Sequence, residues 1–198
     1  MPKSESLHLR GDNIQLESFS EKHKNELFQS AQNPIIWQAM GVSLLDDNFE
    51  AWFDKSMSEF EGSTQIPFVV RRRADDQLIG STRFYDIQPS HASLSIGYTW
   101  YIPEVWGTYV NPEAKLLLLQ HAFEALNLNR VQLKTDMKNL RSRAAIKKLG
   151  AKEEGVLRQH MILDRGVIRD TVIFSIIKPE WPVVKANLQR RLEEYLEA

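Results

Sequence analysis

The sequence predicts a mixed α+β fold (mixed α/β) with a parallel crossover in its second half. Runs rich in aromatic and β-branched residues, typical of strands, alternate with amphipathic stretches typical of helices. Three of the strand-like runs are joined by short loops, which predicts an antiparallel meander. The third run is followed by a long helical segment and another strand, and this order favours a parallel pair.

The first third of the chain predicts a strand or hairpin and then two helices. Residues 7–19 alternate loosely around a turn signal, and Ser20 is suited to cap the helix that follows. A short helical turn at 35–40 leads to a second amphipathic helix at 44–60. The aromatic residues of this second helix recur at spacings of three and four, which is typical of a core face. Part of that stripe is also able to line a substrate cleft.

The remaining elements follow from alternation and from turn residues. The predicted strands are 66–72, 77–87, 93–102, 130–136, 151–163 and 167–177, and the last two form a hairpin around a turn at 164–166. The predicted helices are 111–126, 139–149 and a polar closing helix at 180–198. Residues 1–198 are long enough to form one domain with a sizeable core, and no linker or repeat divides them.

Composition excludes several classes of protein. The net charge of −1 gives no basic footprint for nucleic acid or an anionic membrane. There is no cysteine, so disulfides, thiol catalysis and cysteine zinc sites are excluded, and no histidine or acid spacing indicates a metal. The first ten residues lack the apolar stretch of an export signal, and no apolar run approaches the roughly 18 residues of a membrane span. We expect a soluble cytoplasmic protein.

A strand–turn–helix corner is the strongest local signal. The aromatic strand ending at Ile102 is stopped by Pro103, and Asn111-Pro112-Glu113 is typical of a helix start, with Asn111 as the N-cap. The N-terminus of such a helix offers free N–H groups and a positive dipole end to an anion, usually a phosphate. A corner without a ligand is the alternative for this stretch alone. Glu113 is most simply an acid that favours the helix dipole.

Several segments in order resemble one protein family. Residues 80–85, 96–100, 106–115, 135–151 and 169–176 are similar to the GNAT superfamily of acetyl-CoA-dependent N-acetyltransferases, and within it to the RimJ/RimL-like branch. The resemblance covers residues 14–181. It implies a twisted mixed sheet of about seven strands flanked by helices, in a single domain with 180–198 as an extension. It also implies acetyl-CoA as cosubstrate.

The resemblance assigns cofactor-binding positions. The strand that would pair with the pantetheine arm holds Tyr98, Thr99, Trp100, Tyr101 and Ile102, and the loop around the diphosphate holds Trp106, Gly107, Thr108, Tyr109, Val110 and Asn111. Asn139 would contact the pantetheine, and the Ser142 hydroxyl would protonate the leaving thiolate; helix capping is the alternative for this pair. Arg143 and Lys147 would meet the 3′-phosphate, or else form an exposed helix face.

The chain departs from the family pattern at several positions. Ser95 stands where many relatives have a glutamate base, and Ile146 where many have a tyrosine. Neither side chain titrates, so the general base stays unassigned. Trp106 occupies the position where the loop pattern has a basic or amide residue, and Tyr109 and Asn111 occupy positions where it has small residues. A tyrosine at position 109 would narrow the approach to the phosphates.

The sequence therefore predicts an N-acetyltransferase that acts on a primary amine, either a protein N-terminus or a small molecule. A non-catalytic acyl-CoA-binding or sensing module is the alternative, because the acid/base positions are degenerate. The oligomeric state, including a homodimer, stays open. We interpret Arg71-Arg72-Arg73 as a solvated strand edge and His121 as a core or interface residue.

Overall fold

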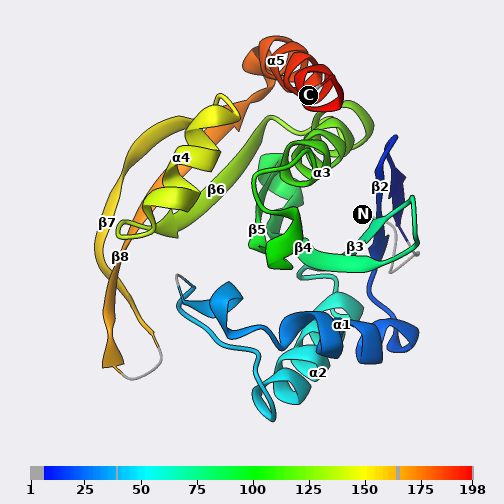
Figure 1. The fold of residues 1–198 in the computed structure, drawn as a ribbon. Coiled ribbons are helices and arrows are strands. Elements are labelled where there is room, and N and C mark those ends of the chain that lie inside the picture. Colours follow the sequence, from blue (N-terminus) through cyan, green and yellow to red (C-terminus); the bar gives the residue numbers. More distant parts are fainter. Residues whose placement is uncertain (1–6, 39, 164–165, 198) are drawn as a thin grey trace.

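The computed structural model describes residues 7–38, 40–163 and 166–197, which form an eight-stranded mixed sheet with helices on both faces (Figure 1). The strands are β1 His8–Arg10, β2 Ile14–Ser18, β3 Ile66–Arg72, β4 Leu78–Gln88, β5 Ser93–Tyr101, β6 Arg130–Asp136, β7 Lys152–Ile162 and β8 Ile168–Ile177. The α-helices are α1 Lys24–Ala31, α2 Asn48–Glu61, α3 Val110–Gln120, α4 Leu140–Lys148 and α5 Trp181–Leu196. None of the described helices is both long and apolar enough to cross a bilayer.

The strand order is β1-β2-β3-β4-β5-β6-β8-β7. Every neighbouring pair is antiparallel except β5 and β6, which run parallel. The predicted meander of β3, β4 and β5, the parallel crossover and the final hairpin are therefore confirmed. The sheet has one strand more than the expected seven because the first segment folds as a hairpin of β1 and β2. The predicted turn between β7 and β8 includes residues 164–165, which lie outside the described residues.

Two apolar clusters hold the helices on opposite faces of the sheet. Phe49 and Phe53 of α2 are fully buried with residues of α1 beneath one face, so the aromatic stripe is a core face as predicted. On the other face α3 packs against the sheet. α5 packs on α3 and on the π-helical turn His121–Ala125 that follows it, where the Phe123 ring stacks on Trp181. Figure 1 shows α1 and α2 on one side and α3 with α5 on the other.

The predicted start of α2 is wrong by four residues. The helix begins at Asn48 rather than at Leu44, because Asp46 has a left-handed backbone with φ of 49° that a continuous helix does not allow. Leu44 is nevertheless buried, as a loop residue of the α1–α2 cluster. The short helical turn is a 3-10 helix over Pro34–Trp37, and Ala39 at its predicted end lies outside the described residues.

The prediction of a solvated edge at Arg71 is wrong. Its side chain is buried and donates to Glu26 at 2.9 Å and to Glu17 at 3.3 Å. These two carboxylates come from α1 and β2, so the guanidinium joins a helix to two strands. Arg72 lies at the end of β3, where it pairs with Asp75 of the β3–β4 turn.

Candidate active site

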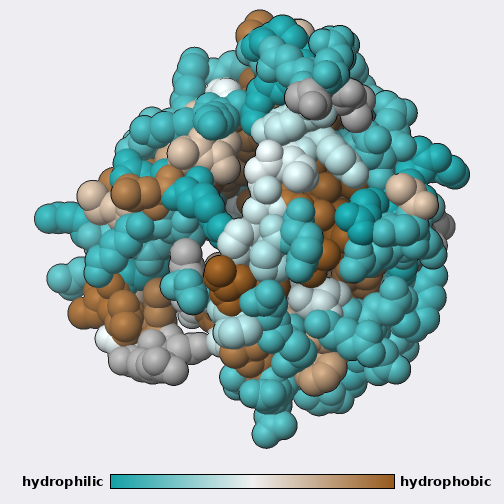
Figure 2. Space-filling view, viewed as in Figure 1, coloured by the Kyte–Doolittle hydropathy of each residue, from teal (hydrophilic) through white to brown (hydrophobic). Residues whose placement is uncertain are grey.

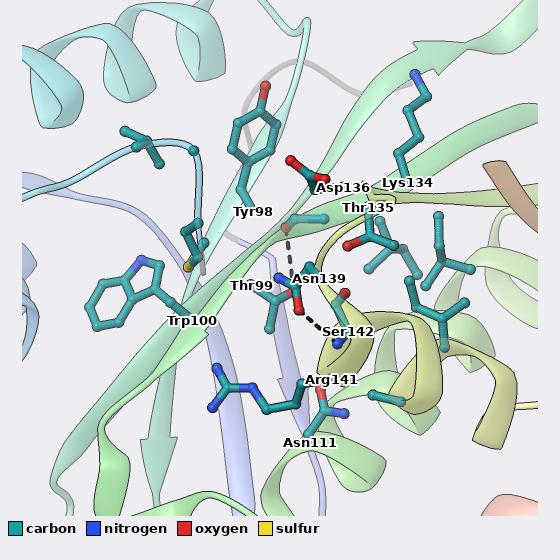
Figure 3. A pocket seen from close by; sticks show the side chains of 18 of the residues that line it. Tyr98, Thr99, Trp100, Asn111, Lys134, Thr135, Asp136, Asn139, Arg141 and Ser142 are labelled. Carbon is teal, nitrogen blue, oxygen red and sulfur yellow. Dashed lines mark hydrogen bonds between the residues drawn. The ribbon is translucent and has the colours of Figure 1, made fainter. Parts of the chain in front are cut away.

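A cavity of about 640 Å³ lies where β5 and β6 separate (Figure 3). The two strands pair from Ser93 opposite Arg130 to Ile96 opposite Leu133, and no further pairing between them is formed by the described residues. β5 nevertheless continues to Tyr101, so its edge toward β6 keeps unpaired backbone groups in this part. The split therefore exposes hydrogen-bonding main chain inside an otherwise continuous sheet.

A bulge in β5 forms one wall of the cavity. Ser81 pairs with Trp100 and Arg83 with Gly97, so that Tyr98 and Thr99 together oppose a single residue of β4. Tyr98 has a left-handed backbone with φ of 50°, a conformation that costs a non-glycine residue about 1–3 kcal/mol. Its ring is half exposed at the cavity wall, with the Arg83 guanidinium 4.7 Å from the ring centroid. The bulge therefore turns the strand away from its neighbour and aims Tyr98 at the cavity.

The N-terminus of α3 points to the cavity, but the predicted cap is wrong. The helix begins at Val110 and its N-cap is Tyr109, which makes no side-chain cap hydrogen bond, so Asn111 lies in the first turn. The Thr108 hydroxyl takes over part of the capping, since it accepts from Val110 N at 3.4 Å. Asn111 lines the cavity instead, and its Oδ1 accepts from the Tyr101 hydroxyl at 3.5 Å. The helix ends near residue 126 as predicted, with its last turn in π geometry over His121–Ala125.

Arg141 of α4 supplies a cation that the sequence analysis missed. Its guanidinium carbon lies 4.2 Å from the centroid of the Trp106 ring, and both residues line the cavity beside Gly107. Arg141 is exposed, and no ion pair of the described residues includes it. Figure 3 shows the Arg141 side chain reaching toward the cavity, near Asn111. The family pattern has a basic or amide residue where this chain has Trp106, and that difference is the signal that could have prompted a search for another cation.

Asn139 and Ser142 lie at the start of α4, on the wall opposite β5. Asn139 is the N-cap, and its Oδ1 accepts from Ser142 N at 2.9 Å. Capping, the alternative reading of this pair, is therefore present. Both residues also line the cavity, where Figure 3 shows their side chains. The two roles are compatible because the cap uses Asn139 Oδ1 and a backbone N–H, which leaves the Ser142 hydroxyl for other contacts.

A carboxylate that the sequence analysis missed lies beside Ser95. The Ser95 hydroxyl donates to Asp86 Oδ2 at 3.4 Å, and Lys134 Nζ of β6 donates to the same oxygen at 2.6 Å. Asp86 lines the cavity and sits at a left-handed position of β4 with φ of 48°. Ile146 is buried in the cavity wall. No sequence signal singles out Asp86, because it comes next to Ser95 only through the pairing of β4 with β5.

Lys115 of α3 is the third residue at the cavity that the sequence analysis missed. It is only 5% exposed and lines the cavity, and its Nζ donates to Thr99 Oγ1 at 2.8 Å. Burial lowers the pKa of Lys115 to about 7. A signal was available, since Lys115 follows Asn111 by four residues and interrupts the apolar face of the helix.

The cavity collects part of the predicted cofactor residues. Those lining it are Tyr98, Thr99, Trp100, Tyr101, Trp106, Gly107, Asn111, Asn139 and Ser142. Those lying outside its wall are Ile102, Thr108, Tyr109, Val110, Arg143 and Lys147. Tyr109 packs partly into the core, and Arg143 and Lys147 both pair with Glu153 of β7, at 3.6 and 2.9 Å.

The far end of the cavity is bounded by the loop before α2 and by the β7–β8 hairpin. A β-carbon on Gly41 would lie 2.6 Å from the terminal methyl groups of Leu163, so a larger residue at position 41 would require the Leu163 side chain to move. His160 of β7 also lines this end, and its Nδ1 is 3.0 Å from the Thr171 hydroxyl. Figure 2 shows the apolar surface of the hairpin next to the hollow between it and the body of the molecule.

Comparison with known proteins gives a consistent result. Residues 13–152 match the family model described as an acetyltransferase (GNAT) domain. The chain is 27% identical over 173 residues to the uncharacterized N-acetyltransferase YoaA of Bacillus subtilis, covering 86% of this chain and 97% of that protein. A GCN5-related N-acetyltransferase from Brucella melitensis superposes with a TM-score of 0.87 at 28% identity, over 96% of this chain and 87% of that one. RimJ of Mycobacterium smegmatis, solved with CoA-disulfide, shares the fold at 21% identity and a TM-score of 0.76, over 94% and 93% of the two chains.

Proposed function

The chain belongs to the GNAT acetyltransferases and is an N-acetyltransferase, and from this premise we propose that it transfers acetyl from acetyl-CoA to a primary amine. The observation that carries the proposal is the cavity at the split of β5 and β6, bounded by the free N-terminus of α3. We further propose a RimJ/RimL-like enzyme whose acceptor is a protein N-terminus or a small-molecule amine. The fold shared with RimJ supports this branch.

The residues around the cavity fit the chemistry of acetyl-CoA. The pantetheine arm of acetyl-CoA contains amides, which can pair with a strand edge that has unpaired N–H and C=O groups. β5 offers such an edge between Tyr98 and Tyr101. A diphosphate needs backbone donors and a cation, which the start of α3 and the Arg141 guanidinium can supply. We propose that Trp106, Gly107 and Asn111 frame the diphosphate and that Asn139 contacts the arm.

The loop and helix residues outside the cavity wall have weaker support as ligands. We keep Thr108, Tyr109 and Val110 as loop residues whose backbone would approach the diphosphate, and Ile102 as the end of the strand edge. Arg143 and Lys147 would meet the 3′-phosphate only if it replaced Glu153 as their partner.

The bound thioester would supply an activated acetyl group, and the chain would orient the amine toward it and move protons. Asp86 lies beside Ser95, the position at which many relatives have a glutamate. We therefore propose that the Asp86 carboxylate accepts a proton from the ammonium group of the acceptor. The Ser142 hydroxyl faces the cavity from α4 and would donate a proton to the leaving thiolate. A backbone N–H of the Tyr98 bulge would polarise the carbonyl.

The whole chain contributes to this site as one proposed domain. The interface of α5 with α3 supports it, since Trp181 Nε1 donates to Glu124 at 2.8 Å and Val184 and Leu188 belong to the core beside α3. We therefore treat residues 1–198 as a single acetyltransferase domain with the closing helix as an extension of its core.

Release of free thiol from acetyl-CoA in the presence of a panel of amines tests the proposed function. The panel should contain peptides with different N-terminal residues and small primary amines, with matched N-acetylated peptides as blanks. We expect acceptor-dependent release with at least one free amine and none with the blanks. Bound CoA without release across the panel would favour the non-catalytic module, and absence of CoA binding would contradict both.

A further inference from the structure

Lys115 is a buried amine at the cavity for which the proposed chemistry has no role. Its Nζ donates to Thr99 Oγ1 at 2.8 Å and to Thr82 Oγ1 at 3.5 Å, and the two hydroxyl oxygens are 2.8 Å apart. The amine therefore sits in a small polar cluster between α3 and the strands β4 and β5. Thr99 is only partly buried and lines the cavity, so this cluster borders the space in which a ligand would lie.

The ammonium form of Lys115 has no countercharge among the residues that the structure describes. None of the ion pairs formed by the described residues includes Lys115, and both of its partners are neutral hydroxyls. Burying an unpaired charge is costly, and burial accordingly lowers the pKa of Lys115 to about 7. Near neutral pH the amine is therefore close to the point at which it gains or loses its proton.

Lys115 also shares a helix face with the start of α3. Asn111 precedes it by four residues, which places the two side chains one turn apart on the same side of the helix, and both line the cavity. The first-turn N–H groups and the Arg141 guanidinium already make this end of the cavity positive. An anion held there would be the missing countercharge for Lys115.

We propose that Lys115 is a cofactor-binding residue whose ammonium balances the anionic end of acetyl-CoA, and that it takes up a proton when the cofactor binds. This role rests on the proposed cosubstrate. A nearby negative charge favours the protonated amine and raises its pKa. Below about pH 7 the free protein already carries the ammonium, so binding takes up no proton there. Above about pH 7 the amine is neutral in the free protein, and affinity falls by up to about tenfold per pH unit.

The other titratable groups near Lys115 stay neutral, point away from it, or are the same in all the variants compared below. On β5, Tyr101 shares the face of Thr99, and burial raises its pKa, so its hydroxyl stays neutral. Arg83 of β4 points to the opposite face, where it donates to Gln65, and Glu113 of α3 is turned toward Asn13. Further groups in the cavity wall are Asp86, Lys134, Asp136, Arg141, His160 and Arg169. Substitution of Lys115 leaves all of these groups in place. Their contributions to the pH dependence of acetyl-CoA binding therefore cancel when the variants are compared with the wild type.

Calorimetric titration with acetyl-CoA in the absence of an acceptor tests the coupling. Acetyl-CoA is preferred to CoA because its thioester does not titrate, and pH values of about 7.5 and about 8.5 lie above the phosphate ionisation near pH 6. Wild-type protein should bind about five- to tenfold more weakly at the higher pH. Lys115→Met should bind more weakly at the lower pH and lose most of this dependence. Lys115→Arg, which stays charged, should restore binding without the dependence.

Titration of the wild type in two buffers with different ionisation enthalpies gives a second readout that needs no variant. We expect uptake of close to one proton per acetyl-CoA bound near pH 8. Binding without proton uptake, or equal pH dependence in wild type and Lys115→Met, would overturn the role of Lys115 and leave the proposed function standing. Failure of acetyl-CoA to bind the wild type at all would overturn both.

Discussion

At the residue scale, the cavity obtains its charged groups from positions that no single segment of the sequence reveals. Arg141 stacks on Trp106 from a different helix, and Asp86 reaches Ser95 from the neighbouring strand. Each arrangement places a charged group next to a position at which this chain departs from the family pattern. We propose that these two residues, which only the folded chain brings near, compensate for the departures at Trp106 and Ser95.

Removal of the Arg141 side chain should weaken acetyl-CoA binding. A charge-assisted hydrogen bond to a phosphate contributes about 1.5 kcal/mol or more, so Arg141→Ala should raise Kd about tenfold. Arg141→Lys should lose less affinity for acetyl-CoA, because it keeps the positive charge. Some affinity should still be lost, because lysine cannot form the planar stack on Trp106. Calorimetry provides the measurement, and Arg190→Ala, at an exposed arginine of α5, is the matched control. Equal Kd for Arg141→Ala and wild type would remove Arg141 from the site.

Neutralising Asp86 should affect catalysis rather than cofactor binding. If its carboxylate accepts the proton of the acceptor, Asp86→Asn should lower kcat about 100-fold with the Kd of acetyl-CoA unchanged. Asp75→Asn, in the exposed turn where Asp75 pairs with Arg72, should leave both quantities unchanged. Steady-state rates with any acceptor identified in the amine panel provide the measurement. A kcat for Asp86→Asn within twofold of wild type would assign the proton to another group.

At the element scale, the first turn of α3 is fixed to the β1–β2 hairpin by Glu113. This side chain is buried, and its carboxylate accepts from Asn13 N at 2.8 Å, Asn13 Nδ2 at 3.1 Å and Ile14 N at 3.3 Å. Sequence reasoning interpreted Glu113 as a first-turn acid, and it does lie there. Its contacts with residues a hundred positions away depend on the packing of α3 over the hairpin, which local sequence does not specify.

Loss of the Glu113 carboxylate should therefore destabilise the fold. Glu113→Ala removes the carboxylate acceptor from the buried backbone N–H of Ile14 and from the part-buried backbone N–H of Asn13. An unsatisfied buried donor costs about 1–3 kcal/mol, so we expect a loss of about 3 kcal/mol in the free energy of unfolding. Glu113→Gln keeps one acceptor oxygen, so its free energy of unfolding should fall by less than that of Glu113→Ala. Urea denaturation provides the measurement, with Glu61→Ala at the exposed end of α2 as control. If Glu113→Ala unfolds at the same urea concentration as the control, the carboxylate does not hold α3 in place.

The edge strand β7 is joined to the sheet by a second carboxylate, Glu154. It pairs with Arg130 of β6 and accepts from Ser175 Oγ of β8 at 2.7 Å, so it bridges three strands. The hydrogen bonds from Arg130 are the main reason that the pKa of Glu154 falls to about 2. Because the folded pKa is below the unfolded one, this stabilisation is present above about pH 4.5 and is lost as the pH falls toward about 2.

Glu154→Gln should accordingly flatten the acid side of the stability curve. The urea midpoint of the wild type should fall more steeply than that of Glu154→Gln between about pH 4.5 and about pH 2.5, since only the wild type loses the ion pair there. Glu61→Gln should keep the wild-type slope. Parallel curves for Glu154→Gln and wild type would mean that the pair contributes nothing measurable, as is common for partly exposed ion pairs.

At the scale of the whole molecule, one topological feature organises the site. The sheet changes from antiparallel to parallel between β5 and β6, and these strands separate after four paired positions. The crossover places the N-terminus of α3 at one end of the split and the start of α4 along its side, as Figure 1 shows. The meander, the bulged strand and the crossover helix thus all converge on the cavity.

Sequence patterns predicted most of this architecture because alternation, caps and turn residues are local. The strand β6 and the helix α4 were placed within one residue, since their alternation and the Asn139 cap are strong local signals. The start of α2, the buried Arg71, and the positions of Lys115 and Asp86 in the cavity wall were not predicted. Each depends on contacts between elements distant in sequence, or on a left-handed residue such as Asp46 that no propensity indicates.

A crystal structure of the protein grown with acetyl-CoA or CoA would show whether the cofactor lies in the split between β5 and β6. We predict that the pantetheine arm lies between β5 and β6 against Tyr98 to Tyr101, and that the diphosphate lies at the N-terminus of α3 beside Arg141. A cofactor bound elsewhere would contradict this prediction. So would the absence of electron density for the pantetheine arm between β5 and β6 under conditions in which calorimetry shows saturated binding.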